Sequence, residues 1–152
     1  MAPKRTRRGF TLIEVLIVVV IMAILAATII PQFSSSTQNA KESSLKFNLS
    51  ALRTQINLYQ LHHNGLLPQI VGGTLPTMAS ATDVNGNIGQ QGASFPYGPY
   101  MANGFPVNPV TGVGTVTSQG TWPPSAASGN NGWLYNPNTG QIAADSATYL
   151  TW

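Results

Sequence analysis

The chain has 152 residues, of which only 7% are charged, and it contains no cysteine. The lack of cysteine excludes disulfides, thiolate zinc sites and a cysteine nucleophile. The formal net charge of +3 comes from a basic block at residues 4–8, because the remaining basic and acidic side chains nearly cancel. No basic surface for nucleic acid is therefore expected on the folded part of the chain.

The first predicted element is an apolar helix over residues 10–30, a run of 21 residues in which Glu14 is the single charge. Such a helix rises about 32 Å, close to the ~30 Å thickness of a bilayer core. The basic block before it favours a cytoplasmic start and an external C-terminal part. A secretory signal peptide fits the length of this run poorly, and a plain single-span anchor leaves Glu14 unexplained.

Glu14 is the unusual residue of this helix, because a lone carboxylate among apolar side chains is costly in a membrane. Residues 10–30 contain no Lys, Arg or His that offers a partner. Cleavage of the chain after Gly9 would create an α-amino group on Phe10, at the depth of Glu14 in a neighbouring copy. Pairing of these two groups would offset the cost of burying both charges and would set the stagger between subunits.

Residues 8–16, RGFTLIEVL, resemble the class III signal of type IV prepilins and type II secretion pseudopilins. The resemblance runs from residue 7 to about residue 33. It implies that a prepilin peptidase cuts after Gly9, that Phe10 is then N-methylated, and that Glu14 serves in assembly. It also implies a helical homo-oligomeric filament, built from the inner membrane by a platform protein and an ATPase, as a periplasmic pseudopilus or a surface pilus.

The helix is expected to continue as an amphipathic segment over residues 31–64, with a kink or short unwound stretch at Pro31. Apolar residues then recur at helical spacing, and Asn64 and Gly65 provide a stop signal. This stripe comprises Leu45, Leu49, Leu52, Ile56 and Tyr59. Core packing beneath a head domain is the favoured interpretation, and a coiled-coil seam is the alternative. His62 and His63 are interpreted as solvated residues at the helix end.

Residues 65–152 are expected to form a β-rich head with many turns, since the chain contains 15 glycines and 11 prolines. The motif N-P-x-T-G occurs at residues 108–112 and again at residues 136–140, and predicts two similar turns. A hairpin is expected around the second copy, with arms at 132–135 and 141–144. Further strands are predicted at 112–117 and 149–152, and residues 72–98 are interpreted as an exposed irregular connection.

The resulting fold class is α+β and pilin-like: a long N-terminal helix packed on a small antiparallel sheet with long loops. The predicted organisation has a leader at 1–9, a transmembrane and polymerisation helix at 10–30, its amphipathic continuation at 31–64, and the head. The head's C-terminal region resembles, more loosely, that of Cys-free major pseudopilins. That resemblance suggests a calcium site, for which Asp145 is the one candidate acid. No other cofactor is expected.

No arrangement of nucleophile and base, paired carboxylates or clustered metal ligands is visible, so the chain is not expected to be an enzyme. The leading hypothesis is a filament subunit, either a type II secretion pseudopilin or a closely related type IV pilin. The alternative is a membrane-anchored binding protein that does not polymerise. Its aromatic surface for sugars would use Trp122, Trp133 and Trp152, although core roles for these residues compete with that reading.

Overall fold

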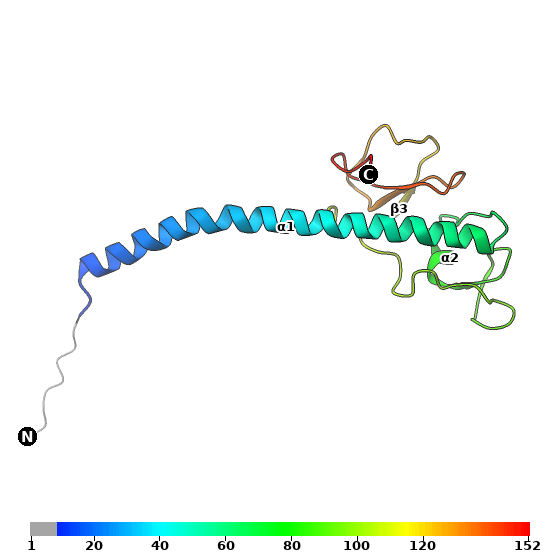
Figure 1. Ribbon diagram of the computed structural model, residues 1–152, viewed down its shortest axis with the longest axis horizontal. Helices are drawn as coiled ribbons and strands as arrows, with labels where there is room; N and C mark the ends of the chain where they lie inside the picture. The colour runs from blue at the N-terminus through cyan, green and yellow to red at the C-terminus, as the bar shows by residue number, and fades with distance from the viewer. Residues whose placement is uncertain (1–8) are drawn as a thin grey trace, which may run out of the picture. The chain divides into compact units, whose positions relative to one another are not determined.

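The computed structural model describes residues 9–152 (Figure 1), and the predicted basic leader residues lie outside this range. The chain divides into two compact units, Met1–Ala40 and Lys41–Trp152, which are described separately. The elements, in chain order, are α1 (Leu12–His62), α2 (Pro76–Ala79), β1 (Ala81–Thr82), β2 (Ile88–Gly89), β3 (Val116–Ser118), β4 (Trp133–Tyr135) and β5 (Ile142–Ala144). This is the α+β, pilin-like arrangement that the sequence predicts.

In the first unit, the N-terminal part of α1 exposes every one of its large apolar side chains. Length and composition make this part of the helix suitable for crossing a membrane once. Pro31 lies inside α1, and the helix is continuous through it. The unwound stretch that was considered for this position is therefore absent, while a kink at Pro31 stays a prediction.

In the second unit, the predicted apolar stripe of α1 forms one side of the core, as expected. Leu45, Leu52 and Ile56 are at most 1% exposed. They pack against residues from α2 and from the C-terminal strands, among them Met78, Trp133 and Ile142. The helix ends as predicted, because Asn64 and Gly65 both adopt positive φ, and the Gly65 N–H donates to the Gln60 carbonyl. Burial within the protomer therefore explains the stripe without a coiled coil.

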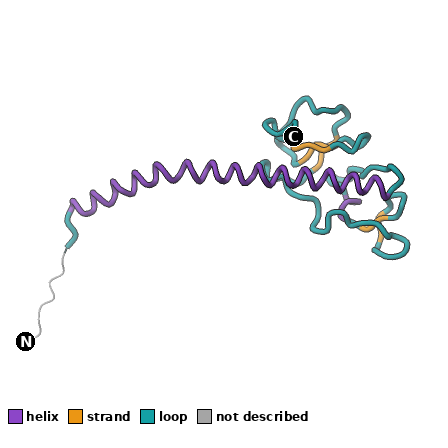
Figure 2. Tube along the Cα trace, viewed as in Figure 1, coloured by secondary structure: helices purple, strands orange, loops and turns teal. Residues whose placement is uncertain are grey.

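The C-terminal sheet has the strand order β3-β4-β5, and its strands are short (Figure 2). β4 and β5 form the predicted antiparallel hairpin, with Trp133 opposite Ala144 and Tyr135 opposite Ile142. β3 pairs with β4 in parallel, with Val116 opposite Trp133, so the sheet is mixed and not purely antiparallel. The connection between β3 and β4 is long enough to return the chain to the same end of the sheet, which a parallel pair requires.

The two N-P-x-T-G turns have nearly the same hydrogen bonds. In each, the Asn side-chain oxygen accepts from the backbone N–H two residues later at 2.9 Å, at Val110 and at Asn138. In each, the glycine N–H donates to the Asn carbonyl at 2.8 Å. Gly112 has φ 73° and Gly140 has φ 75°, values that side chains rarely adopt. Both turns predicted from the motif are confirmed.

These twin turns provide a matched test of backbone strain against packing. Gly112→Ala is expected to cost about 1–2 kcal/mol, because its new Cβ meets open space and only the positive φ is penalised. Gly140→Ala is expected to cost about 1 kcal/mol more, because its Cβ would lie 2.7 Å from Leu67 Cδ2. Thermal unfolding of the two variants measures the difference, and equal losses would contradict the packing contribution.

The strand predicted at 112–117 is found only in part, as β3 at Val116–Ser118, and three smaller expectations about the second unit are wrong. His63 is not solvated but fully buried, stacked on Tyr59 with its ring nitrogens near the Tyr59 carbonyl and the Thr82 hydroxyl. Residues 72–98 are not simply an exposed connection, since they contain α2, β1, β2 and buried side chains. Residues 149–152 form a turn instead of a strand. At His63 and in residues 72–98, contacts with distant residues override the local polar composition, whereas the turn at 149–152 is closed by local hydrogen bonds from Tyr149 to Ser146 and from Trp152 to Tyr149.

Candidate assembly site at the start of the long helix

The first turn of α1 is closed by a reciprocal cap between Thr11 and Glu14. The Thr11 backbone N–H donates to Glu14 Oε2 at 2.8 Å, and the Thr11 hydroxyl donates to the same oxygen at 2.7 Å. The Glu14 N–H in turn lies 3.3 Å from the Thr11 hydroxyl oxygen. This is the capping box, in which a hydroxyl residue and an acid three residues later satisfy the donors of a helix start. The spacing T-x-x-E is the signal by which this cap can be recognised in a sequence.

The cap uses only one of the two carboxylate oxygens of Glu14. Both hydrogen bonds from Thr11 fall on Oε2, and within residues 9–152 no donor reaches Oε1. The side chain is exposed, so Oε1 is accessible to a group from outside the protomer. A carboxylate has about four acceptor positions, and a second charged donor is therefore compatible with the cap. The cap orients Glu14 while preserving its ability to pair.

Gly9 and Phe10 lie just before this cap, and neither is helical. Phe10 is 88% exposed, and a Cβ atom added at Gly9 would meet no atom within 4 Å. A protease needs an extended segment, because a helix hides its own peptide bonds in the hydrogen-bond ladder. The bond between Gly9 and Phe10 is thus presented in a form suited to cleavage.

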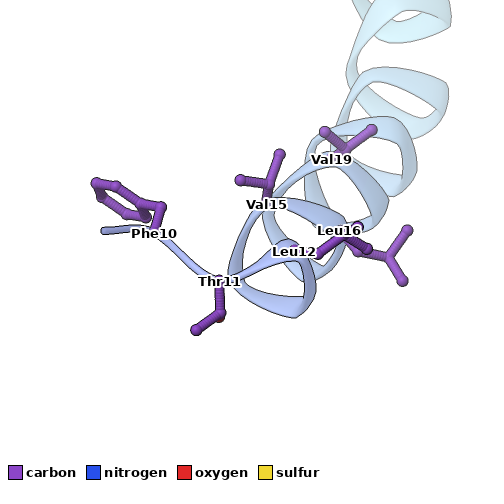
Figure 3. A pocket seen from close by; sticks show the side chains of 6 residues that line it. All are labelled: Phe10, Thr11, Leu12, Val15, Leu16 and Val19. Atoms are coloured by element: carbon purple, nitrogen blue, oxygen red, sulfur yellow. The ribbon is translucent and has the colours of Figure 1, made fainter. Parts of the chain in front are cut away.

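The surroundings of Phe10 are apolar. A shallow groove is lined by Phe10, Thr11, Leu12, Val15, Leu16 and Val19, whose side chains gather around the first turns of α1 (Figure 3). Exposed apolar side chains of this extent are typical of a surface that meets lipid or another apolar helix. Glu14 and this apolar groove therefore lie on the same short segment.

Asp145, the calcium candidate, lies far along the chain and is fully buried. Its Oδ1 accepts from the Ser128 and Gly129 N–H groups, and its Oδ2 accepts from the Ser128 hydroxyl and the Asn131 N–H. Burial by itself would raise the pKa of this carboxyl, but the Ser128 hydroxyl and the three N–H groups outweigh burial and lower the pKa. Asp145 organises the 128–131 loop through donors of the chain itself. Among the described residues, no three His, Cys, Asp or Glu side chains cluster as metal ligands.

Comparison with known proteins gives one family match and several relatives. Residues 4–30 match the prokaryotic N-terminal methylation motif. The chain is 41% identical over 58 residues to the type II secretion system core protein G of Pseudomonas aeruginosa, and 30% identical over 89 residues to that of Escherichia coli. It is 55% identical over 47 residues to the type IV major pilin protein PilA of Myxococcus xanthus.

These matches cover only part of each protein. The chain spans 41% of the Pseudomonas relative, 61% of the Escherichia relative and 21% of the Myxococcus relative. The corresponding shares of this chain are 38%, 54% and 31%. No solved structure matches the chain. The motif match and these relatives confirm the resemblance of the chain, through its N-terminal part, to the family of type IV pilins and type II secretion pseudopilins.

Proposed function

We propose that this chain is the precursor of a structural subunit of a type IV pilus-like filament. A prepilin peptidase cuts it after Gly9 and methylates the new amine of Phe10. The subunit waits in the inner membrane as a single-span protein with its head outside. It then joins a helical filament of identical copies through packing of α1, with the help of a platform protein and an ATPase.

The observation that carries this proposal is the geometry of Glu14. Thr11 holds one carboxylate oxygen, and the other is accessible to a donor from a second copy. A free amine on Phe10 is the donor that cleavage would supply at the required depth. In an apolar setting an ammonium and a carboxylate attract strongly, so this pairing selects one stagger between neighbouring helices.

The apolar part of α1 supports the same function. Its large side chains are exposed throughout, including Ile13 at 71% and Phe33 at 71%. Lipid tails and neighbouring helices are both apolar, so exchanging one for the other on extraction costs little hydrophobic free energy. The apolar surface therefore permits assembly, while the charge pair gives it direction and register.

Within this class, a secretion pseudopilus is the favoured filament, because the two core protein G relatives match more of the chain than the pilin does. A surface pilus is the second candidate, which the short but closer match to PilA favours. Immunogold labelling separates the two: a pseudopilus stays in the periplasm, whereas a pilus is labelled outside intact cells.

The direct test of the proposal is mass spectrometry of the mature N-terminus. A chain that begins at an N-methylated Phe10 and is recovered in filaments supports the function. Unprocessed chain recovered only as membrane monomers would favour the anchored binding protein instead.

Gly9→Leu is expected to leave uncleaved precursor as the main species, with at least a tenfold loss of processing. Misfolding is not expected, because a Cβ atom at Gly9 would meet nothing within 4 Å. We therefore expect the defect to arise in the peptidase, which has to accommodate the new side chain next to the scissile bond. Gly9→Ala should give a smaller loss. Immunoblotting resolves precursor from product, and normal processing of Gly9→Leu would refute the assigned bond.

A further inference from the structure

The second unit carries a furrow along one edge of α1 that the proposed function does not use. One part lies between α1 and the end of the hairpin, and is lined by Arg53, Asn57, Trp122, Thr139, Gly140, Gln141 and Ile142. The adjoining part is lined by Lys46, Leu49, Ser50, Arg53, Thr54, Asn57 and Trp152. Arg53 and Asn57 belong to both parts, so the two form one continuous furrow.

The furrow has a distinctive chemical lining. Its two charged side chains, Lys46 and Arg53, are both basic, and no Asp or Glu side chain lines either part. Amide and hydroxyl side chains supply donors and acceptors between them. An indole lies at each part, Trp122 in one and Trp152 in the other, and both are half-buried. Aromatic faces flanked by amides and hydroxyls are suited to sugar rings, and basic groups add a preference for acidic ones.

The basic side chains are held in place. Arg53 donates through Nη2 to the Ile142 carbonyl at 3.1 Å and also to the backbone oxygen of Trp152. Lys46 Nζ lies 4.4 Å from the centroid of the Trp152 ring. A guanidinium has five N–H donors, so these contacts orient Arg53 without using all of them. Preorganised donors lose less conformational entropy when a ligand binds.

Trp122 differs from Trp152 in having no ring partner among the described residues. Trp152 packs on Tyr149, with ring centroids 4.4 Å apart, and is covered by Lys46. No ring or cation contact involves Trp122 within residues 9–152. Its face is therefore the one available for stacking, next to Arg53 and Asn57.

We propose that this furrow binds an acidic polysaccharide, one sugar ring stacking on Trp122 while carboxylates contact Arg53 and Lys46. A polymer fits better than a single sugar, because the two parts adjoin along α1 and have room for successive rings. The site lies wholly in the second unit, and it does not depend on cleavage or polymerisation.

Isothermal titration calorimetry of the full-length chain in detergent tests this. Polygalacturonate is the acidic probe and dextran the neutral one. Saturable binding of polygalacturonate is expected, at least tenfold tighter than that of dextran and weaker in high salt. Absence of binding, or equal binding of dextran, would overturn the proposal.

Variants locate the binding. Trp122→Ala is expected to weaken polygalacturonate binding roughly tenfold through lost stacking. Asn57→Ala should weaken it several-fold without harming the fold, because Asn57 is exposed on a helix and alanine favours helix. Lys41→Gln is the control, since Lys41 is exposed on α1 but lines neither part of the furrow. If Lys41→Gln weakened binding as much as Trp122→Ala and Asn57→Ala, the interaction would be diffuse attraction and the assigned site would be wrong.

Discussion

Glu14→Ala is expected to abolish filament assembly while leaving membrane insertion and cleavage of the Gly9–Phe10 bond intact. The variant removes the carboxylate but not the amine that would pair with it, so each subunit would bury an uncompensated charge. Removing one partner of a buried pair is strongly destabilising, because the other charge is left without compensation. Sheared-filament yield, measured beside the processed monomer in the membrane, reports the effect. Wild-type yield from Glu14→Ala would refute the pairing.

The capping box sharpens this experiment with a second pair of variants. Thr11→Val keeps the shape of the side chain but removes the hydroxyl that holds Glu14 Oε2. Assembly should then fall less than in Glu14→Ala, because the carboxylate is still present but less well oriented. Thr11→Ser restores the hydroxyl and should restore the yield. If Thr11→Val and Thr11→Ser behaved alike, the hydroxyl would have no part in orienting Glu14.

Asp145→Asn is expected to destabilise the head by about 3 kcal/mol, the second largest effect. The carboxylate accepts four hydrogen bonds in a buried site, and an amide would place its NH₂ group against donors of the 128–131 loop. The melting temperature of the full-length chain in detergent, followed by near-UV circular dichroism, should fall by roughly 10 °C or more. Asp83→Asn provides the control, since Asp83 caps the Asn85–Asn87 turn at the surface, and its loss should be much smaller.

The acid dependence of stability should follow from the same carboxylate. The pKa of the Asp145 carboxyl is lowered in the folded protein. Its contribution to the free energy of unfolding is therefore complete above the pKa that an Asp has in the unfolded chain, about 4. That contribution is lost as the pH falls through the lower folded-state pKa. Asp145→Asn should therefore flatten the decline of stability below about pH 4.

Calcium and a chelator should both leave the melting temperature of the wild type unchanged, because the chain's own donors satisfy the carboxylate of Asp145. A large increase in melting temperature with calcium would support the calcium site that was expected at Asp145 from the sequence.

Much of the fold follows from local patterns in the sequence. The stripe from Leu45 to Tyr59 repeats at helical spacing, and such a repeat leaves few alternatives for which face is buried. The N-P-x-T-G turns were readable because each position has a local reason: an Asn cap, a fixed proline φ and a glycine with positive φ. The two turns have the same conformation because it depends only on these local residues.

The segment to which we assign assembly is likewise determined by sequence. Its essential parts lie within six residues, from Gly9 to Glu14, and the helix that carries them needs no tertiary contact to form in an apolar setting. The cap at Thr11 could have been read from its T-x-x-E spacing. The sequence could not show that the cap leaves one oxygen of Glu14 accessible, because this depends on the position of the side chain in space.

Tertiary structure alone decided the features that depend on distant partners. His63 is more deeply buried than His62 because Tyr59 and Thr82 enclose it. The contact with Thr82 cannot be predicted from the residues around His63 in the sequence. The parallel pairing of β3 with β4 and the burial of Asp145 by the 128–131 loop are also long-range. The sequence by itself therefore determined the long apolar helix and its charged residue, where the chemistry is local. The fold determined what the head's polar residues do, since a buried polar group must find its donors wherever the chain happens to place them.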